Sequence, residues 1–184
     1  MRFLLDTNVL IPFHSKNFLM ELGYRGLPVH WSVSIETEFV RVWARLYPDK
    51  AGHGPKILTA MHRAVPEWRA PESRKVLQAA ALPDPYDRHV LAAAVGVGAT
   101  VIVTRNLKDF PQDVLAEYGI VARSADDVLC RLFDEDPEAF LEASGAMRRR
   151  LKAPPMTAEE WINSLMQGDC VLLAAKLRPY LAHL

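Results

Sequence analysis

The sequence predicts an α/β fold of three layers (α/β/α), in which helices cover a central parallel sheet, followed by an all-helical extension. First, residues 2–5 form a short run without alternation that stops at a carboxylate, as strands buried on both faces do. Second, such runs alternate with helical periodicity as far as residue 122. Third, only helical patterns follow from residue 124. We therefore expect two units, residues 1–123 and 124–184.

In the first unit the strands and helices are expected in the order β-α-β-α-α-α-β-α-β. After the first strand, apolar spacing predicts a helix over residues 9–22 that ends near two glycines, and a second strand follows at 27–31. Ser34 is a suitable N-cap for the next helix, which continues through Leu46. Residues 47–55 are rich in Pro, Gly and Asp and predict a loop, and 57–65 predict another helix.

The stretch from residue 82 to 122 is the most regular part of the chain. An Ala-rich helix over 88–95 stops at Gly96 and Gly98, and the β-branched run 99–104 predicts a strand. A turn over 106–111, a short helix ending at Tyr118 and a last strand over 119–122 complete the first unit.

Four helices are expected in the second unit. Three starts are marked by capping residues, at Ser124, at Asp136-Pro137 and at the capping box Thr157-Ala-Glu-Glu160. The fourth covers 169–178, where Pro179 should end or kink it, and Ala153-Pro-Pro155 separates the helices into pairs.

Composition narrows the class of protein. The 184 residues include 22 Lys and Arg and 22 Asp and Glu, and 50% are hydrophobic, which suits a well-buried core. Zero net charge argues against a purely electrostatic nucleic-acid binder but leaves room for a local basic groove. Cys130 and Cys170 are interpreted as buried free thiols, which fit a reducing cytoplasm. The first strand starts at Arg2 and no apolar run approaches 18 residues, so we expect a cytoplasmic protein without signal peptide or membrane span.

Four carboxylates fall at strand ends or helix starts. Asp6 ends the first strand, Glu38 lies one turn into the helix after the second, Asp87 starts the Ala-rich helix, and Asp109 follows the β-branched strand with Asn106 beside it. In a parallel sheet these positions converge on one edge. Two carboxylates about 4 Å apart repel by about 4 kcal/mol at an effective dielectric near 20, so the cluster needs protons or cations. Hard oxygen ligands suit Mg²⁺ or Mn²⁺.

Each position also has a simpler interpretation. Asp6 could cap a helix, Glu38 could be an exposed charge, Asp87 could favour a helix dipole, and Asp109 could be a turn residue. The set as a whole carries more weight than any one member.

Four segments resemble the successive acidic motifs of PIN-domain ribonucleases, in the order of that family and over about two-thirds of the chain. They are Leu5-Asp-Thr-Asn-Val-Leu10, Glu38-Phe-Val-Arg-Val42, Pro83-Asp-Pro-Tyr-Asp-Arg-His-Val-Leu-Ala-Ala-Ala94 and Val103-Thr-Arg-Asn-Leu-Lys-Asp-Phe-Pro111. The helical extension, with Pro154-Pro-Met-Thr157, resembles the C-terminal extension of one branch of VapC-type toxins.

The resemblance implies that Asp6, Glu38 and Asp87 are catalytic metal ligands for Mg²⁺ or Mn²⁺. Many family members have Asp where this chain has Asn106, so either Asn106 ligates as an amide or Asp109 supplies the charge; we favour Asp109 with Asn106 as its helper. Glu36 is an alternative to Glu38. The residues that could orient the ligands or bind the metal through water are Thr7, Asn8, Asp84 and Thr104.

The implied reaction is endonucleolytic hydrolysis of RNA, in which metal-activated water attacks the phosphodiester and leaves 5′-phosphate and 3′-hydroxyl ends. Basic residues beside the acidic motifs are candidates for RNA contact: Arg41, Arg88, His89, Arg105 and Lys108. Zinc is not expected, because the histidines show no paired ligand spacing.

The resemblance to VapC-type toxins implies a type II toxin held inactive by an antitoxin protein. A housekeeping PIN nuclease in RNA processing and a catalytically weak RNA-binding or scaffold module are the alternatives. The extension could bind the antitoxin, form a homodimer or cover the sheet edge.

Overall fold

A computed structural model describes residues 1–152 and 154–184 and confirms the predicted parallel sheet. Its four strands are β1 (Phe3–Leu5), β2 (Val29–His30), β3 (Val101–Val103) and β4 (Val121–Arg123), in the order β2-β1-β3-β4. Phe3 pairs with both Val29 and Val101, and every pair of neighbouring strands is parallel. The carboxyl ends of β1 and β3 therefore lie side by side at one edge.

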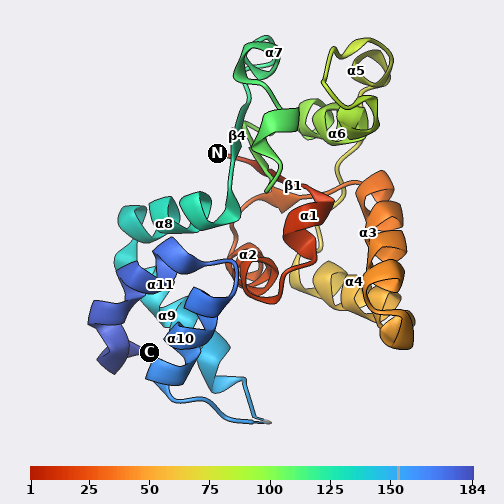
Figure 1. Ribbon diagram of the computed structural model, residues 1–184. Coiled ribbons are helices and arrows are strands. Elements are labelled where there is room, and N and C mark those ends of the chain that lie inside the picture. Colours follow the sequence, from red (N-terminus) through yellow and green to blue (C-terminus); the bar gives the residue numbers. More distant parts are fainter. Residues whose placement is uncertain (153) are drawn as a thin grey trace.

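Eleven α-helices accompany the sheet in the described residues. They are α1 (Thr7–Leu10), α2 (Phe13–Tyr24), α3 (Val33–Leu46), α4 (His53–Ala64), α5 (Arg74–Ala79), α6 (Arg88–Val97), α7 (Gln112–Ala116), α8 (Ala125–Glu135), α9 (Pro137–Arg149), α10 (Ala158–Gln167) and α11 (Val171–Leu177). Short 3-10 helices cover Pro48–Lys50, Pro85–Asp87, Leu107–Asp109 and Arg178–His183. Figure 1 shows α8–α11 gathered beside α2, on the opposite side of the molecule from α3 and α4. None of the helices in the described ranges is long and apolar enough to cross a membrane.

Two predicted helix boundaries are wrong for local reasons. The single helix expected over 9–22 is two helices, because Pro12 has an extended backbone and no amide hydrogen to continue α1. The N-cap of α3 is Ser32 and not Ser34: the Ser32 hydroxyl accepts a 3.3 Å hydrogen bond from the Ile35 amide.

The structure also contains helix that the sequence pattern does not predict. Helix α4 starts at His53, inside the predicted loop over 47–55, and α5 lies in a stretch for which the sequence pattern predicts no element. Helix α5 packs on α6 and buries Val76 alone among its six residues. One apolar anchor in so short a helix leaves no periodic signal in the sequence.

The C-terminal helices begin where the sequence predicts. Ser124, Asp136 and Thr157 each accept a cap hydrogen bond, and Thr157 and Glu160 form the expected capping box. Helix α11 ends at Leu177, and a 3-10 helix kinked at Tyr180 continues past Pro179. Ala153, in the predicted separator, lies outside the described residues.

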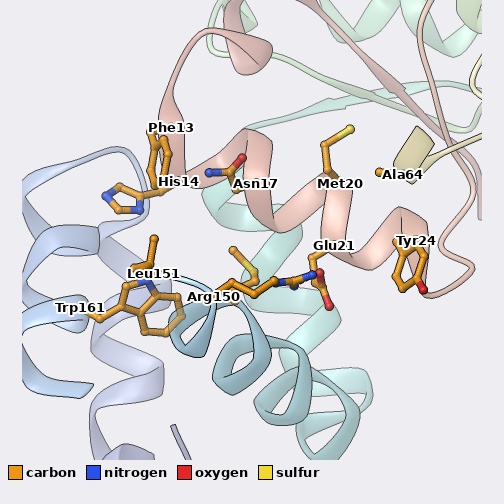
Figure 2. A pocket seen from close by; sticks show the side chains of 11 residues that line it. Phe13, His14, Asn17, Met20, Glu21, Tyr24, Ala64, Arg150, Leu151 and Trp161 are labelled. Atoms are coloured by element: carbon orange, nitrogen blue, oxygen red, sulfur yellow. The ribbon is translucent and has the colours of Figure 1, made fainter. Parts of the chain in front are cut away.

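These helices pack on α2. The Phe18 ring centroid lies 5.6 Å from that of Phe140 and 5.7 Å from that of Trp161. Arg150 forms an ion pair with the buried Glu21 of α2, and Figure 2 shows its side chain reaching across a hollow to that carboxylate. One hydrophobic cluster thus runs from the sheet into the extension, and the division at residues 123 and 124 stays a prediction. Cys130 and Cys170 are buried free thiols within it.

Candidate active site

Asp6 is fixed by the sheet at the end of β1. Its amide donates to the carbonyl of Val103 in β3 at 3.0 Å, and its side chain is almost fully buried. Although Asp6 occupies the N-cap position of α1, its carboxylate makes no cap hydrogen bond. Instead Oδ2 accepts from the Thr104 hydroxyl at 2.7 Å and from the Asn8 side-chain amide at 2.6 Å. The carboxylate is thus oriented by side chains, not by the helix that it precedes.

Thr104 and Asn8 connect the two central strands around this carboxylate. The Thr104 hydroxyl accepts from the Asn8 amide at 3.0 Å and from the Asn106 backbone N–H at 3.0 Å. Asn8 Oδ1 in turn accepts from the Arg105 backbone N–H at 2.8 Å. The segment after β3 is therefore tied to the start of α1. Asn8 and Thr104, two of the four predicted orienting residues, lie beside Asp6.

Glu38 reaches the same region from α3. Its Oε2 accepts a 2.6 Å hydrogen bond from the Thr7 hydroxyl and lies 3.5 Å from His89 Nε2. His89 is the main cause that lowers the pKa of Glu38, and Thr7 adds to the effect against the opposing influence of burial. Thr7 thus joins Glu38 of α3 to the residue that follows Asp6.

Asp87 is positioned by a short 3-10 helix. Asp84 caps that helix by accepting from the Tyr86 amide at 2.8 Å, and Asp87 follows at its end, where α6 begins. Burial, followed by the charges of Asp6, Asp84 and Asp109, raises the pKa of Asp87 to about 6. A carboxyl whose pKa is raised by burial and by neighbouring like charges is typical of a crowded acidic site.

Asn106 and Asp109, the two candidates for the fourth acidic position, lie together after β3. Asn106 donates a side-chain hydrogen bond to Asp109 Oδ2 across the Leu107–Asp109 turn.

Burial and then the charge of Glu38 raise the pKa of Asp6. Asp6, Glu38, Asp87 and Asp109 are thus linked as one electrostatic cluster, which we call the carboxylate cluster.

The structure does not bring Glu36 into this cluster. The Glu36 carboxylate accepts a 2.8 Å hydrogen bond from the Trp31 indole and pairs with His62 of α4. Trp31 stacks on Trp68 with ring centroids 5.3 Å apart, and His62 of α4 stacks on both rings, so Glu36 contacts this aromatic cluster. The alternative role of Glu36 in place of Glu38 has no geometric support.

The basic candidates divide into two groups. Arg41, Arg105 and Lys108 are exposed around the cluster, with Arg41 Nη2 3.9 Å from Glu38 Oε1. Arg88 is partly buried, and its Nε donates to the Ala80 carbonyl at 2.8 Å, which anchors α6 to the preceding segment. Arg88 is therefore used structurally within the chain.

His89, predicted from the sequence as a candidate for RNA contact, instead contacts Glu38 in the structure. Its Nδ1 lies 2.7 Å from the Tyr86 carbonyl, and its Nε2 faces Glu38. Burial opposes protonation of the ring, but the Glu38 carboxylate prevails and raises the pKa of His89. The available sequence signal is the two-residue offset from Asp87, which places both side chains at the first turn of α6.

The donor chemistry of the cluster fits a hard divalent cation. All four principal side chains offer carboxylate oxygens. Burial, and after it the repulsion between carboxylates, raises the pKa of Asp6 and of Asp87, and a cation would relieve that repulsion. Within the described ranges, no three acidic, His or Cys side chains converge closely enough to hold an ion by themselves.

Comparison with known proteins supports the same region. Residues 2–108 match the family model of the PIN domain, and residues 125–179 match that of the VapC50 C-terminal domain. The chain is 44% identical over 93 residues to "Putative ribonuclease VapC50" of Mycobacterium tuberculosis (strain ATCC 25618 / H37Rv), across 50% of this chain and 54% of that protein. The chain thus matches about half the length of this curated relative. No solved structure matches.

Proposed function

Since this chain belongs to the PIN-domain family, we propose that it is a metal-dependent endoribonuclease and the toxin of a toxin–antitoxin pair. The observation that carries the proposal is the carboxylate cluster. Four acidic side chains from separate elements are electrostatically coupled at one edge of the sheet, and Thr7, Asn8 and Thr104 orient two of them. A structural role would not require carboxylates to be gathered at this energetic cost.

Each acidic residue has a distinct part in this proposal. Asp6, Glu38, Asp87 and Asp109 would hold Mg²⁺ or Mn²⁺, and Asn106 would keep Asp109 in position. When bound, the ion supplies an activated water and neutralises charge on the scissile phosphate. Thr104 and Asn8 hold Asp6 Oδ2, while Thr7 holds Glu38 Oε2, so the carboxylates keep their orientation as substrate arrives. Rigid orientation of the ligands supports catalysis because little reorganisation is then needed.

RNA contacts near the cut would come from exposed cations. Arg41 is 80% exposed at its side chain, and Arg105 and Lys108 are exposed beside Asn106. Their charges offset the local negative field of the carboxylates and offer phosphate contacts.

The activity is tested with purified protein and a labelled RNA. With Mg²⁺ we expect cleavage to products with 5′-phosphate and 3′-hydroxyl ends, and EDTA should abolish it. The variant Asp6→Asn should lose at least 100-fold in rate, whereas Asp49→Asn, which changes an exposed carboxylate of the Pro48–Lys50 turn, should cleave like the wild type. Cleavage in EDTA, or an unaffected Asp6→Asn variant, contradicts the proposal.

The toxin role is tested in cells. The match of residues 125–179 to the VapC50 C-terminal domain supports it, and it implies a cytoplasmic site of action and an inhibitory antitoxin. Induced expression should arrest growth, and co-expression of a small protein encoded next to the gene should relieve the arrest. RNA cleavage without growth arrest would instead indicate a housekeeping nuclease.

A further inference from the structure

A basic hollow lies outside the carboxylate cluster, between α2, the C-terminal part of α3 and α4. It measures about 590 Å³. Its walls combine apolar side chains with positively charged or titratable nitrogen bases: Lys16, Lys50, His53 and Lys56 with Phe13, Met20, Trp43, Ile57, Ala60 and Met61. In a chain with equal numbers of acidic and basic residues, no carboxylate is among the described residues that line it. We call this cavity the Lys16 hollow.

Lys16 is the unusual member of this lining. It is only 7% exposed, and within residues 1–152 and 154–184 its ammonium makes no hydrogen bond or ion pair. Its nitrogen lies 5.9 Å from the centre of the Trp43 ring. Burial lowers the pKa of Lys16, against the opposing charge of Asp169. Most of the Lys16 side chain is buried, but Lys16 lines the open hollow and its nitrogen is not among the fully buried atoms that lack a partner. Its charge is therefore available to an anionic ligand.

Aromatic faces lie beside these cations. Phe13 is 56% exposed, and the Trp43 ring is fixed by a 2.9 Å hydrogen bond from its Nε1 to the Lys50 carbonyl. Phe13, Asn17 and Met20 also line the neighbouring hollow drawn in Figure 2, so the two hollows meet along this face of α2. Cations for a phosphate next to aromatic rings for a base are the components of a single-stranded nucleic acid site.

The hollow is lined by elements that carry or adjoin members of the carboxylate cluster. Phe13 starts α2 just after α1, the helix that Asp6 precedes, and Trp43 follows Glu38 by five residues in α3, or about 7.5 Å along the helix axis. We propose that the Lys16 hollow binds a nucleotide of the RNA substrate that flanks the cleaved bond. Lys16 contacts its phosphate, and Phe13 and Trp43 contact its base. This inference rests on the proposed function.

The test measures RNA binding without cleavage, by fluorescence anisotropy of a short single-stranded RNA in EDTA. Lys16→Gln should bind about tenfold more weakly, and the slope of log affinity against log salt should fall by about 0.7 for one lost phosphate contact. The exposed Lys56→Gln should behave similarly if Lys16→Gln does not fold. Lys75→Gln on α5 is the matched control for charge and should bind like the wild type.

The aromatic contact has its own pair of variants. Phe13→Ser should weaken binding about tenfold without changing the salt slope, while Leu172→Ser, an exposed apolar residue of α11, should have no effect. Wild-type affinity in both Lys56→Gln and Phe13→Ser overturns the proposal. The proposal is also overturned if these variants lose binding to an acidic peptide while their affinity for RNA is unchanged, because the hollow would then bind a protein partner. If wild-type protein binds RNA in EDTA but does not cut it with Mg²⁺, the nuclease proposal fails while the variants still report on the hollow.

Discussion

Thr104 donates a 2.7 Å hydrogen bond to Oδ2 of Asp6 from a position 98 residues further along the chain. The Thr104 side chain is completely buried, and the same hydroxyl accepts from Asn8 and from the Asn106 amide. One hydroxyl therefore joins the ends of β1 and β3 and orients the carboxylate at the centre of the site.

We predict that Thr104→Val impairs both activity and stability. The methyl group keeps the volume but leaves Asp6 and the Asn106 amide without this partner, which should cost about 1–3 kcal/mol of unfolding free energy. Loss of ligand orientation should lower kcat/KM by about 10–100-fold. Thr104→Ser retains the hydroxyl and should remain within about threefold of the wild type in kcat/KM. Equal kinetics for the Val and Ser variants would contradict the orienting role.

Asp87→Asn should separate stability from activity. Burial and the charges of Asp6, Asp84 and Asp109 raise the pKa of Asp87 to about 6, so its ionised form destabilises the fold at neutral pH. Since the group is partly exposed, we expect a gain of only about 1 kcal/mol at pH 7.5 in EDTA. The gain should shrink as the pH falls through about 6 and vanish below the ordinary value of 3.8, where this carboxyl is protonated in both the folded and the unfolded state. Denaturant titrations with parallel RNA cleavage, which should be lost, check this.

Single substitutions at Asn106 and Asp109 can show which of the two residues contacts the metal. If Asp109 supplies the ligand and Asn106 positions it, Asp109→Asn should lower cleavage by more than tenfold and Asn106→Ala by a smaller factor. Initial rates over a range of Mg²⁺ concentrations measure both variants. A larger loss for Asn106→Ala would assign the direct metal contact to Asn106.

Glu21 should make stability depend on acid pH. Burial opposes its ionisation, but hydrogen bonds from Arg25 and Arg150 prevail and lower its pKa. Its contribution is therefore fully present above the ordinary pKa of 4.5 and is lost as the pH falls through the lower folded value. Glu21→Gln should cost about 1–3 kcal/mol at pH 7, with a difference that shrinks below pH 4.5. The exposed Glu142→Gln should change stability by less than about 0.5 kcal/mol.

Trp161→Ala tests whether the C-terminal helices and the sheet form one folding unit. Trp161 is almost fully buried against Phe18 of α2, so the substitution should cost about 3–5 kcal/mol. Denaturant unfolding should keep a single transition, shifted to lower concentration, and Leu172→Ala on the exposed face of α11 should leave it in place. Two separate transitions would instead support independent units at 1–123 and 124–184.

The sequence was most informative where the signal is local. Three kinds of prediction depend on only a few neighbouring residues, and the structure confirms them. They are the first apolar strand ending at Asp6, the β-branched strand around Ile102, and the helix caps at Ser124, Asp136 and Thr157. It was less informative where two local signals compete. Ser32 and Ser34 are both plausible caps. The chain is extended through Trp31, which forms a parallel bridge with Arg69, and the helix begins directly after Ser32.

At the site, the same distinction separates Glu38 from Glu36. Both carboxylates lie in the first turns of α3, and the sequence offers no reason to prefer one beyond the family motif. In the structure His62 of α4 pairs with Glu36, whereas the Thr7 hydroxyl at the start of α1 donates a hydrogen bond to Glu38. The assignment of the four carboxylates as metal ligands stays a prediction.

By itself the sequence determined the α/β alternation, the parallel sheet and the position of each acidic residue at a strand end or helix start, because these follow from periodicity and capping over short distances. Only the tertiary structure decided which side chains meet: Asp6 with Thr104, Glu38 with His89, and Lys16 with the Trp43 ring. The physical reason is that a contact between distant residues depends on how whole elements pack. The hydrogen bond that holds Asp6 in place exists only after β1 and β3 have paired.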